Sequence, residues 1–362
     1  MRKRRAKLLV LNILPLLLLV MATLFGPAAA SSRAEEPVII LRLSTFIPPA
    51  HPASKLFQAF AKELESASHN RVKVEYYGTS SLGGAKEQYE ITVEGLADLA
   101  VTCCAYKGSR FPLALGVQLP LFTDSAETGT QIIMELMRQG FFKREFADSV
   151  YLFPLATTPS RVFSNKKITK VEDFRGLRIF GGESVFIDVC DQLGATPITM
   201  STPDVYMAMQ RRTLDAGVAP WTPAIAAWRW QEVARYAIDV PILSGWHCNM
   251  VMHRESWERI PEDIKKAWRP LFPKYAIKFA RLYQQLDSIM KAKCAKYRGC
   301  EIIEFPESEI HKLAERMVPV WQKWIADNGT EGRRFYRAYV EIMQRLGKKV
   351  WVKLPGLYDE PQ

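Results

Sequence analysis

The sequence lacks the short motifs that mark the common classes of enzyme. It contains no Gly-x-Ser-x-Gly turn, no His-Glu-x-x-His zinc motif and no glycine-rich loop of the kind that cradles phosphate. Carboxylates are plentiful, but no spacing among them singles out an acid–base pair. These absences leave esterases, zinc peptidases and nucleotide-dependent enzymes without support, and they predict a protein that is not an enzyme and has no cofactor.

Histidine is also scarce, with five in 362 residues. His247 and His253 share one face of a predicted strand with Asn249, which is a conceivable edge for a metal. A pair of imidazoles is usually structural, however, and zinc sites take three or four such ligands. The sequence therefore predicts no metal.

Only one stretch is long and apolar enough to be considered as a membrane segment. Residues 1–30 open with basic side chains, continue with an apolar run over Leu8–Phe25 and end at the small residues Ala28–Ala30. This pattern is typical of a cleaved signal peptide and predicts an exported, periplasmic protein. An uncleaved anchor is the alternative because of the length of the run. Asn12 and Pro15 interrupt it, which favours cleavage.

The positive charge gives little indication of a nucleic-acid partner. Five of the basic residues lie in the leader, which has no acidic residue, so its removal lowers the formal net charge from +11 to +6. The rest of the excess is spread along the chain and is not gathered in one block. Nucleic-acid binding is therefore not expected, although a modest positive field could draw in anionic solutes.

Export makes disulfides permissible for the six cysteines. Cys294 and Cys300 are the best pair, because five residues separate them at what looks like a helix-to-strand turn. No Cys-x-x-Cys occurs, so thiol oxidoreductase chemistry is poorly supported. The other four have no evident partner, and the first two are expected to be buried strand residues: Cys103, Cys104, Cys190 and Cys248.

The first third of the mature chain alternates strand and helix patterns. Val38–Ser44 is an apolar run that suits a strand covered on both faces. Apolar residues at helical spacing follow over Leu56–Leu64, then an alternating strand over Val72–Tyr76. Lys86–Gly95 reads as a helix and Asp98–Cys104 as another buried strand. The order β-α-β-α-β predicts a doubly wound unit.

The middle of the chain, Thr157–Trp228, continues this alternation, so its strand ends should face a ligand cleft. Asn249–Met252 then reads as a strand that returns to the first unit. Over Pro261–Arg298 an apolar stripe with steps of three and four predicts a long helix. Pro270 and Pro273 should kink or break that helix early.

The C-terminal part predicts a short strand over 301–305 and two helices, 307–327 and 331–346. The tail from 347 to 362 is expected to be irregular.

The order and spacing of several motifs resemble the DctP-type solute-binding proteins of TRAP transporters. The resemblance covers roughly Leu41–Leu346, and no single motif is diagnostic. The motifs that carry it are His51-Pro52, Asn70–Val74, Ser81–Gly83, Gly95–Ala100, Leu119–Phe122, Arg161–Asn165, Gly176–Phe180 and Leu214–Gly217.

The resemblance implies an α/β, two-lobed periplasmic-binding-protein fold, with doubly wound sheets joined by hinge strands and a long backing helix. Lobe I would comprise residues 37–158 and 248–288, and lobe II residues 159–247 and 289–346. The implied function is that of a monomeric periplasmic receptor that closes on a small organic acid and delivers it to TRAP membrane permease subunits. Two alternatives stay open: a ligand-sensing subunit for a receptor kinase, and an exported enzyme on the same scaffold.

The resemblance also places candidate ligand contacts. Arg161 matches a cleft arginine of the family, and a guanidinium can bind a carboxylate through two charge-assisted hydrogen bonds. Without the resemblance, a structural ion pair would be the simpler interpretation. The family's main carboxylate clamp is a second arginine, but Phe180 occupies that position here. Arg178 shares the strand face with Phe180 but aligns with an ordinary lysine, so we do not expect it to compensate.

A second departure points the same way. Before the proline of the next motif the family commonly has asparagine, whereas this chain has Ala219, followed by Pro220 and Trp221. Losing a cation and an amide while gaining aromatic rings makes the pocket more apolar. The sequence therefore predicts an aromatic or extended monocarboxylate as ligand, and not a C4-dicarboxylate. The remaining candidate contacts, all at predicted strand ends or turns, are Phe46, Glu87, Tyr106, Trp246 and His247.

Overall fold

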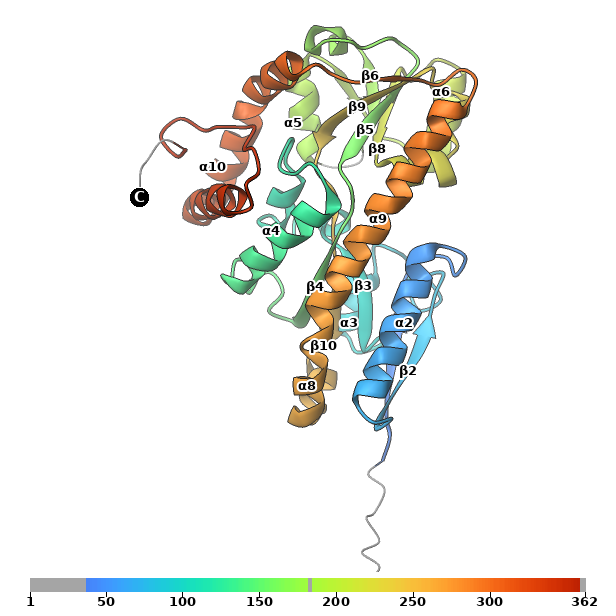
Figure 1. The fold of residues 1–362 in the computed structure, drawn as a ribbon, viewed down its shortest axis with the longest axis vertical. Helices are drawn as coiled ribbons and strands as arrows, with labels where there is room; N and C mark the ends of the chain where they lie inside the picture. The colour runs from blue at the N-terminus through green and yellow to red at the C-terminus, as the bar shows by residue number, and fades with distance from the viewer. Residues whose placement is uncertain (1–36, 182–183, 359–362) are drawn as a thin grey trace, which may run out of the picture. The chain divides into compact units, whose positions relative to one another are not determined.

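The computed structural model describes residues 37–181 and 184–358 (Figure 1). The predicted signal peptide, 1–30, and the end of the predicted tail lie outside the described residues. By its internal contacts the chain divides into Met1–Val38 and Ile39–Gln362, and every described helix and strand lies in the second unit. None of the helices in the described part has the length and apolar character needed to cross a membrane.

The first sheet confirms the predicted doubly wound unit. Strands β1 (Ile39–Ser44), β2 (Val72–Tyr77) and β3 (Leu99–Cys103) are parallel, with β1 between the other two. The connections are helices α2 (Pro52–Ala67) and α3 (Gln88–Val93). Helical crossovers of this kind are what a parallel sheet requires. The apolar periodicity of the sequence thus located each element to within a few residues.

Two antiparallel strands complete this sheet. β10 (His247–His253) lies between β3 and β4 (Ser149–Ala156), so the predicted return of the chain to the first unit is confirmed. The expectation that β1 is covered on both faces was wrong for its beginning, where the Ile40 side chain is 58% exposed. Leu41 and Leu43 point to the opposite face and are fully buried.

The second sheet has the strand order β11-β9-β5-β8-β6-β7. Its strands pair both parallel and antiparallel, and helices α5 and α6 connect the strands at one end. The bounds in chain order are β5 Ser160–Ser164, β6 Arg178–Phe180, α5 Ser184–Leu193, β7 Thr196–Ile198, α6 Thr202–Gln210, β8 Ala216–Ala219, β9 Tyr236–Leu243 and β11 Glu301–Ile303.

Three segments join the sheets. The chain crosses from β4 to β5 through residues 157–159 and from β9 to β10 through 244–246. The third connection is α9 (Leu271–Lys296), the long helix that packs against β4 of one sheet and β11 of the other (Figure 1). As predicted, the helical stretch breaks early, since α8 (Glu262–Trp268) ends just before Pro270. Two helix-covered sheets connected in this way form the predicted α/β two-lobed fold, while the exact lobe boundaries stay a prediction.

The two C-terminal helices expected from the sequence are confirmed, and they meet at a kink within one span. α10 runs over Glu307–Arg345, and its backbone departs from helical geometry only at Gly329, which has φ of 56°. The remaining elements are short or lie at the edges: α4 Ala126–Arg138, α7 Arg254–Glu258, the 3₁₀ turns η1 Cys104–Lys107, η2 Ala114–Gln118, η3 Val171–Phe174 and η5 Trp230–Glu232, and the π-helical turn η4 Pro223–Ala227.

The structure contains the predicted disulfide between Cys294 and Cys300. It also contains one between Cys103 and Cys248, so the expectation that these two cysteines have no partner was wrong. These two residues lie directly opposite each other on β3 and β10. Their separation of 145 residues hides this proximity in the sequence.

Candidate functional site

An apolar cavity of about 320 Å³ lies where the chain crosses between the sheets. Six aromatic or imidazole rings contribute to its walls, and no lysine, arginine, aspartate or glutamate among the described residues lines it. The sixteen lining residues are Phe46, Ile47, Pro48, His51, Val101, Thr157, Pro220, Thr222, Pro223, Ala226, Ala227, Trp228, Trp246, Cys248, Phe279 and Tyr283.

The ends of strands place these residues together. Phe46 follows β1, Thr157 follows β4 and Pro220 follows β8, so three strands of the two sheets point their carboxyl ends at the cavity. Clefts of α/β proteins typically form at this edge of a sheet. The sequence-based expectation that strand ends face the cleft therefore describes this cavity.

Two crossing segments are fastened to each other beside the cavity. The Thr157 N–H donates to the Trp246 carbonyl at 3.1 Å, and the Trp246 N–H donates to the Thr157 hydroxyl at 2.8 Å. A Cβ atom at Gly245 would lie 1.9 Å from the Thr157 carbonyl oxygen, so this approach requires glycine. The backbone here fixes the positions of two lining residues.

Aromatic packing holds the walls of the cavity. Tyr106 packs edge-on against Phe46 at 5.9 Å and against Trp246 at 6.3 Å, so it supports two lining rings without lining the cavity itself. Two further lining rings, Phe279 and Tyr283 of α9, stack at 4.5 Å. Rings fixed in this way present flat apolar faces to a ligand.

His51 is the lining residue with an ionisable imidazole. It is the N-cap of α2, where its Nδ1 accepts a hydrogen bond from the Ala53 N–H at 3.1 Å. Burial lowers its pKa below the ordinary value. Its ring lies 6.1 Å from that of Tyr283.

A buried carboxylate lies behind the cavity wall. Asp287 of α9 accepts hydrogen bonds from both the backbone N–H and the hydroxyl of Thr222, at 2.9 and 2.7 Å. Burial raises the pKa of Asp287, although these hydrogen bonds oppose the effect. Thr222 is thus committed to Asp287 and fixes the start of the η4 segment.

Arg161 does not line the cavity. Its Nε forms an ion pair with Asp239, and its Nη1 donates to the Pro159 carbonyl at 3.0 Å. Lys291 of α9 bonds the other oxygen of Asp239 and also pairs with Glu304 at 3.0 Å. Although burial opposes it, the charges of Arg161 and Lys291 hold the pKa of Asp239 below its ordinary value. A role for Arg161 in ligand binding stays a prediction.

The residues at the two departures from the family pattern lie in a separate core. Phe180 packs edge-on against Trp230 at 6.2 Å, and Trp221 packs against Phe163 at 5.2 Å. Ala219 is buried opposite Arg161 in the β5–β8 pairing. None of the three predicted residues lines the cavity, but Ala219 and Trp221 flank the lining residue Pro220.

Arg178, the residue considered as a substitute clamp, is bound to Asp215. Its Nε lies 2.9 Å from one carboxylate oxygen, and its backbone N–H bonds the same oxygen at 2.9 Å. Burial opposes the effect, but hydrogen bonds from Arg178 lower the pKa of Asp215 to about 2. This arrangement holds β6 to the start of β8.

The last two predicted contacts also lie outside the cavity lining. Glu87 is exposed at the start of α3. His247 is fully buried, with Nε2 2.7 Å from the Tyr151 hydroxyl and Nδ1 3.1 Å from the Ala114 carbonyl. Burial lowers the pKa of His247 to about 4. Two of the nine predicted residues, Phe46 and Trp246, therefore line the cavity.

Sequence reasoning missed His51, Trp228, Phe279 and Tyr283 as cavity residues. The first could have been found, because His51 lies in the turn that follows the first strand, as Phe46 does. The two α9 residues carry no such signal, since their helical spacing reads as ordinary core. No cluster of three or more potential metal ligands occurs within residues 37–181 and 184–358.

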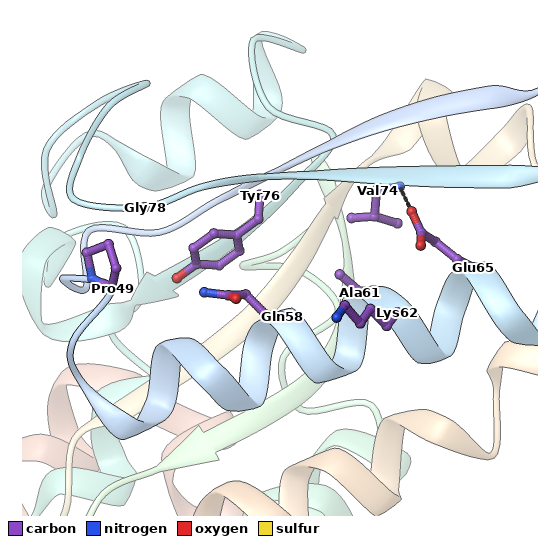
Figure 2. A pocket seen from close by; sticks show the side chains of 8 residues that line it. All are labelled: Pro49, Gln58, Ala61, Lys62, Glu65, Val74, Tyr76 and Gly78. Atoms are coloured by element: carbon purple, nitrogen blue, oxygen red, sulfur yellow. Dashed lines mark hydrogen bonds between the residues drawn. The ribbon is translucent and has the colours of Figure 1, made fainter.

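A second hollow, of about 400 Å³, lies between α2 and β2 (Figure 2). Figure 2 shows Lys62 and Glu65 on the helix beneath it and Tyr76 on the strand above. Glu65 is already bonded to the Val74 N–H at 2.9 Å. The hollow contains none of the predicted contacts.

Comparisons with known proteins agree on one family. A model described as DctP, bacterial extracellular solute-binding protein, family 7, matches residues 43–328. A solute-binding protein of Albidiferax ferrireducens is 23% identical over 286 residues, which cover 76% of this chain and 82% of the relative.

Solved structures share the fold. A marine metagenome TRAP solute-binding protein specific for aromatic acids, in complex with metahydroxyphenylacetate, has a TM-score of 0.75 at 20% identity and covers 89% of this chain and all of its own. A TRAP solute-binding protein of Rhodoferax ferrireducens with copurified benzoate has a TM-score of 0.75 at 21% identity, with coverages of 85% and 98%.

Proposed function

Because the chain belongs to the DctP family of bacterial extracellular solute-binding proteins and is a TRAP solute receptor, we propose that it binds an aromatic monocarboxylate in the cavity between its two sheets. The observation that carries this proposal is the chemistry of the lining. Rings form the walls, and the described lining holds no formally charged side chain.

A C4-dicarboxylate would fit this lining poorly. It carries two charges and little apolar surface, so both carboxylates would lose hydration without cationic partners. An aromatic acid instead buries its ring against Phe46, Trp246 and Phe279 and exposes one charged group to the polar atoms at the edge. The difference in burial favours the aromatic acid.

Proteins of the same fold support this choice of ligand class. The complexes with metahydroxyphenylacetate and benzoate are joined by a Bordetella bronchiseptica receptor with bound mandelate. Each of these ligands pairs one carboxylate with one aromatic ring. Their identity to this chain is low, so the lining itself is the stronger argument.

The proposed mechanism is closure of the two lobes on the ligand. Phe46 and Phe279 contact the ligand from the side of the first sheet, while the segment Pro220–Trp228 contacts it from the second. A ligand that bridges both sides stabilises the closed form. The protein then acts as a monomer in the periplasm and hands its solute, unaltered, to the membrane permease subunits of a TRAP transporter.

Thermal shift of the purified protein tests the ligand class. We expect benzoate, 3-hydroxybenzoate, mandelate or 3-hydroxyphenylacetate to raise the melting temperature, whereas succinate and malate leave it unchanged. A ligand at a hundred times its Kd stabilises the fold by about 2.7 kcal/mol, which such a scan detects easily. Stabilisation by the dicarboxylates equal to that by the aromatic acids would contradict the proposal, as would a panel in which no aromatic acid acts.

A further inference from the structure

An aromatic acid bound in this cavity needs a partner for its carboxylate, and the lining offers no lysine or arginine within residues 37–181 and 184–358. Arg161, whose charge acts on Asp287 behind the cavity wall, is already paired with Asp239. The carboxylate must therefore find its hydrogen-bond donors among neutral groups. Such donors would deepen the proposed function, on which their role rests, by specifying how the same cavity recognises its ligand.

His51 presents one such donor because of its place in the fold. Its Nδ1 accepts a hydrogen bond from the Ala53 N–H, so that nitrogen carries a lone pair. A neutral imidazole with an unprotonated Nδ1 has its proton on Nε2. No described residue accepts a hydrogen bond from His51 Nε2. The N-cap interaction thus selects the tautomer whose donor is left for a ligand.

Tyr283 presents a second donor beside the first. Its ring lines the cavity at 6.1 Å from the His51 ring, and its hydroxyl is bonded to no residue in the described part of the chain. Burial, and then the negative charge of Asp287, raise the pKa of Tyr283 well above its ordinary value. The hydroxyl therefore keeps its proton and can donate it to a carboxylate.

The electrostatic surroundings of His51 and Tyr283 are compatible with a bound anion. His51 caps the N-terminus of α2, a helix of sixteen residues whose positive dipole end points to the cavity edge. Asp287 lies one turn beyond Tyr283, but two hydrogen bonds from Thr222 and the charge of Arg161 offset its field. The positive N-terminal end of α2 attracts the ligand's carboxylate, and the negative charge of Asp287 is largely offset. We therefore expect the carboxylate to lie next to His51.

We propose that the Nε2–H of His51 and the hydroxyl of Tyr283 together hold the carboxylate of the aromatic ligand, in place of the cationic clamp. The recognised chemistry is a single carboxylate next to a ring. Two neutral donors in adjacent rings favour an acid with one carboxylate, because a second carboxylate would find no equivalent pair among the lining residues.

Two variants remove the donors one at a time. Asparagine is a strong N-cap residue, so His51→Asn keeps the start of α2. The shorter side chain removes the Nε2–H donor of the imidazole. Tyr283→Phe removes the hydroxyl and keeps the ring. The matched controls are His311→Asn, whose ring packs on Trp351 in the C-terminal region, and the exposed Tyr297→Phe.

Isothermal titration calorimetry compares the tightest binder among the four aromatic acids with its neutral amide. Losing a hydrogen bond to a charged group weakens binding about 10- to 100-fold, so each cavity variant should lose that much affinity for the acid. The amide should change less than about threefold, and both controls should bind as wild type.

Nuclear magnetic resonance of the wild-type protein labelled with ¹⁵N-histidine gives a readout that depends on no variant. The acid should shift the Nε2 proton of His51 downfield and leave Nδ1 unprotonated. The proposal is overturned if wild type binds the acid while both variants bind it equally well and the His51 signals do not move, or if acid and amide are weakened alike. Wild type that binds no aromatic acid would refute the proposed function itself.

Discussion

Two neighbouring regions of this molecule use polar side chains in opposite ways. In the ion-pair cluster formed by Arg161, Asp239 and Lys291, the strong hydrogen-bonding groups have partners within the chain. In the cavity, His51 Nε2 and the Tyr283 hydroxyl have none among the described residues. A charge that is already paired stabilises the fold, whereas an unpaired donor facing a cavity is available to a ligand. Residue type alone does not distinguish the two.

The largest effect is expected where the two regions share a segment. Replacing Gly245 with alanine brings a Cβ within 1.9 Å of the Thr157 carbonyl oxygen, and backbone must move to relieve the clash. We expect a loss of about 3 kcal/mol or more in the free energy of unfolding, measured by urea denaturation, together with weaker binding of aromatic acids. Gly108→Ala, whose Cβ would meet only a flexible leucine tip, is the control. Equal stability of both variants would show that the backbone of the crossing segments can move to accommodate a Cβ atom at Gly245.

Acid should weaken the fold through a histidine that has internal partners. Burial lowers the pKa of His247 to about 4 in the folded protein, against about 6.5 when unfolded, so the unfolded chain binds the extra proton between these values. Stability attributable to His247 is complete above pH 6.5 and falls by about 3 kcal/mol as pH drops to 4.

The measurement is urea unfolding of wild type and His247→Gln across this range. The variant lacks the titrating group, so the difference in stability between the two proteins should shrink as pH falls. A constant difference would mean that His247 does not titrate on unfolding.

Removing a cavity ring should affect binding more than folding. Trp246→Ala takes away one aromatic wall, and we expect about a 100-fold loss of affinity for an aromatic acid by calorimetry. Trp351→Ala, at a site remote from the cavity and packed on His311, should leave affinity unchanged. If both variants bind alike, the ligand lies elsewhere, and the hollow between α2 and β2 becomes the next place to search.

The smallest effect on ligand affinity is expected from variants in the ion-pair cluster, because its residues do not line the cavity. Arg161→Ala should cost about 2 kcal/mol of stability, less than a fully buried pair, because Lys291 still neutralises Asp239. Arg178→Ala, which breaks a more exposed pair with Asp215, should cost less stability than Arg161→Ala. Neither should change affinity for an aromatic acid by more than about threefold. Loss of acid binding in Arg161→Ala alone would instead make Arg161 the anchor, as the family resemblance implies.

The local pattern of apolar residues in the sequence predicted the helices and strands well, but it predicted few of the residues that line the cavity. The alternation over Val72–Tyr76 and the helical spacing over Leu56–Leu64 located β2 and α2, and Pro270 correctly ended the first part of the long helix. Phe46 and Trp246 were found because strand ends are visible in the sequence. Phe279 and Tyr283 were not, since a stripe on a helix reads the same whether it faces core or cavity.

The sequence by itself determined the order of the elements, which follows from periodicity along the chain. Its motifs also determined the family, and the resemblance to that family implied the two-lobed α/β class. Only the tertiary structure decided which polar groups are satisfied. Asp239 lies 78 residues from Arg161, and Cys248 lies 145 from Cys103. Partners so distant in sequence meet only through sheet register and helix packing, and those contacts determine which donors are left facing the cavity.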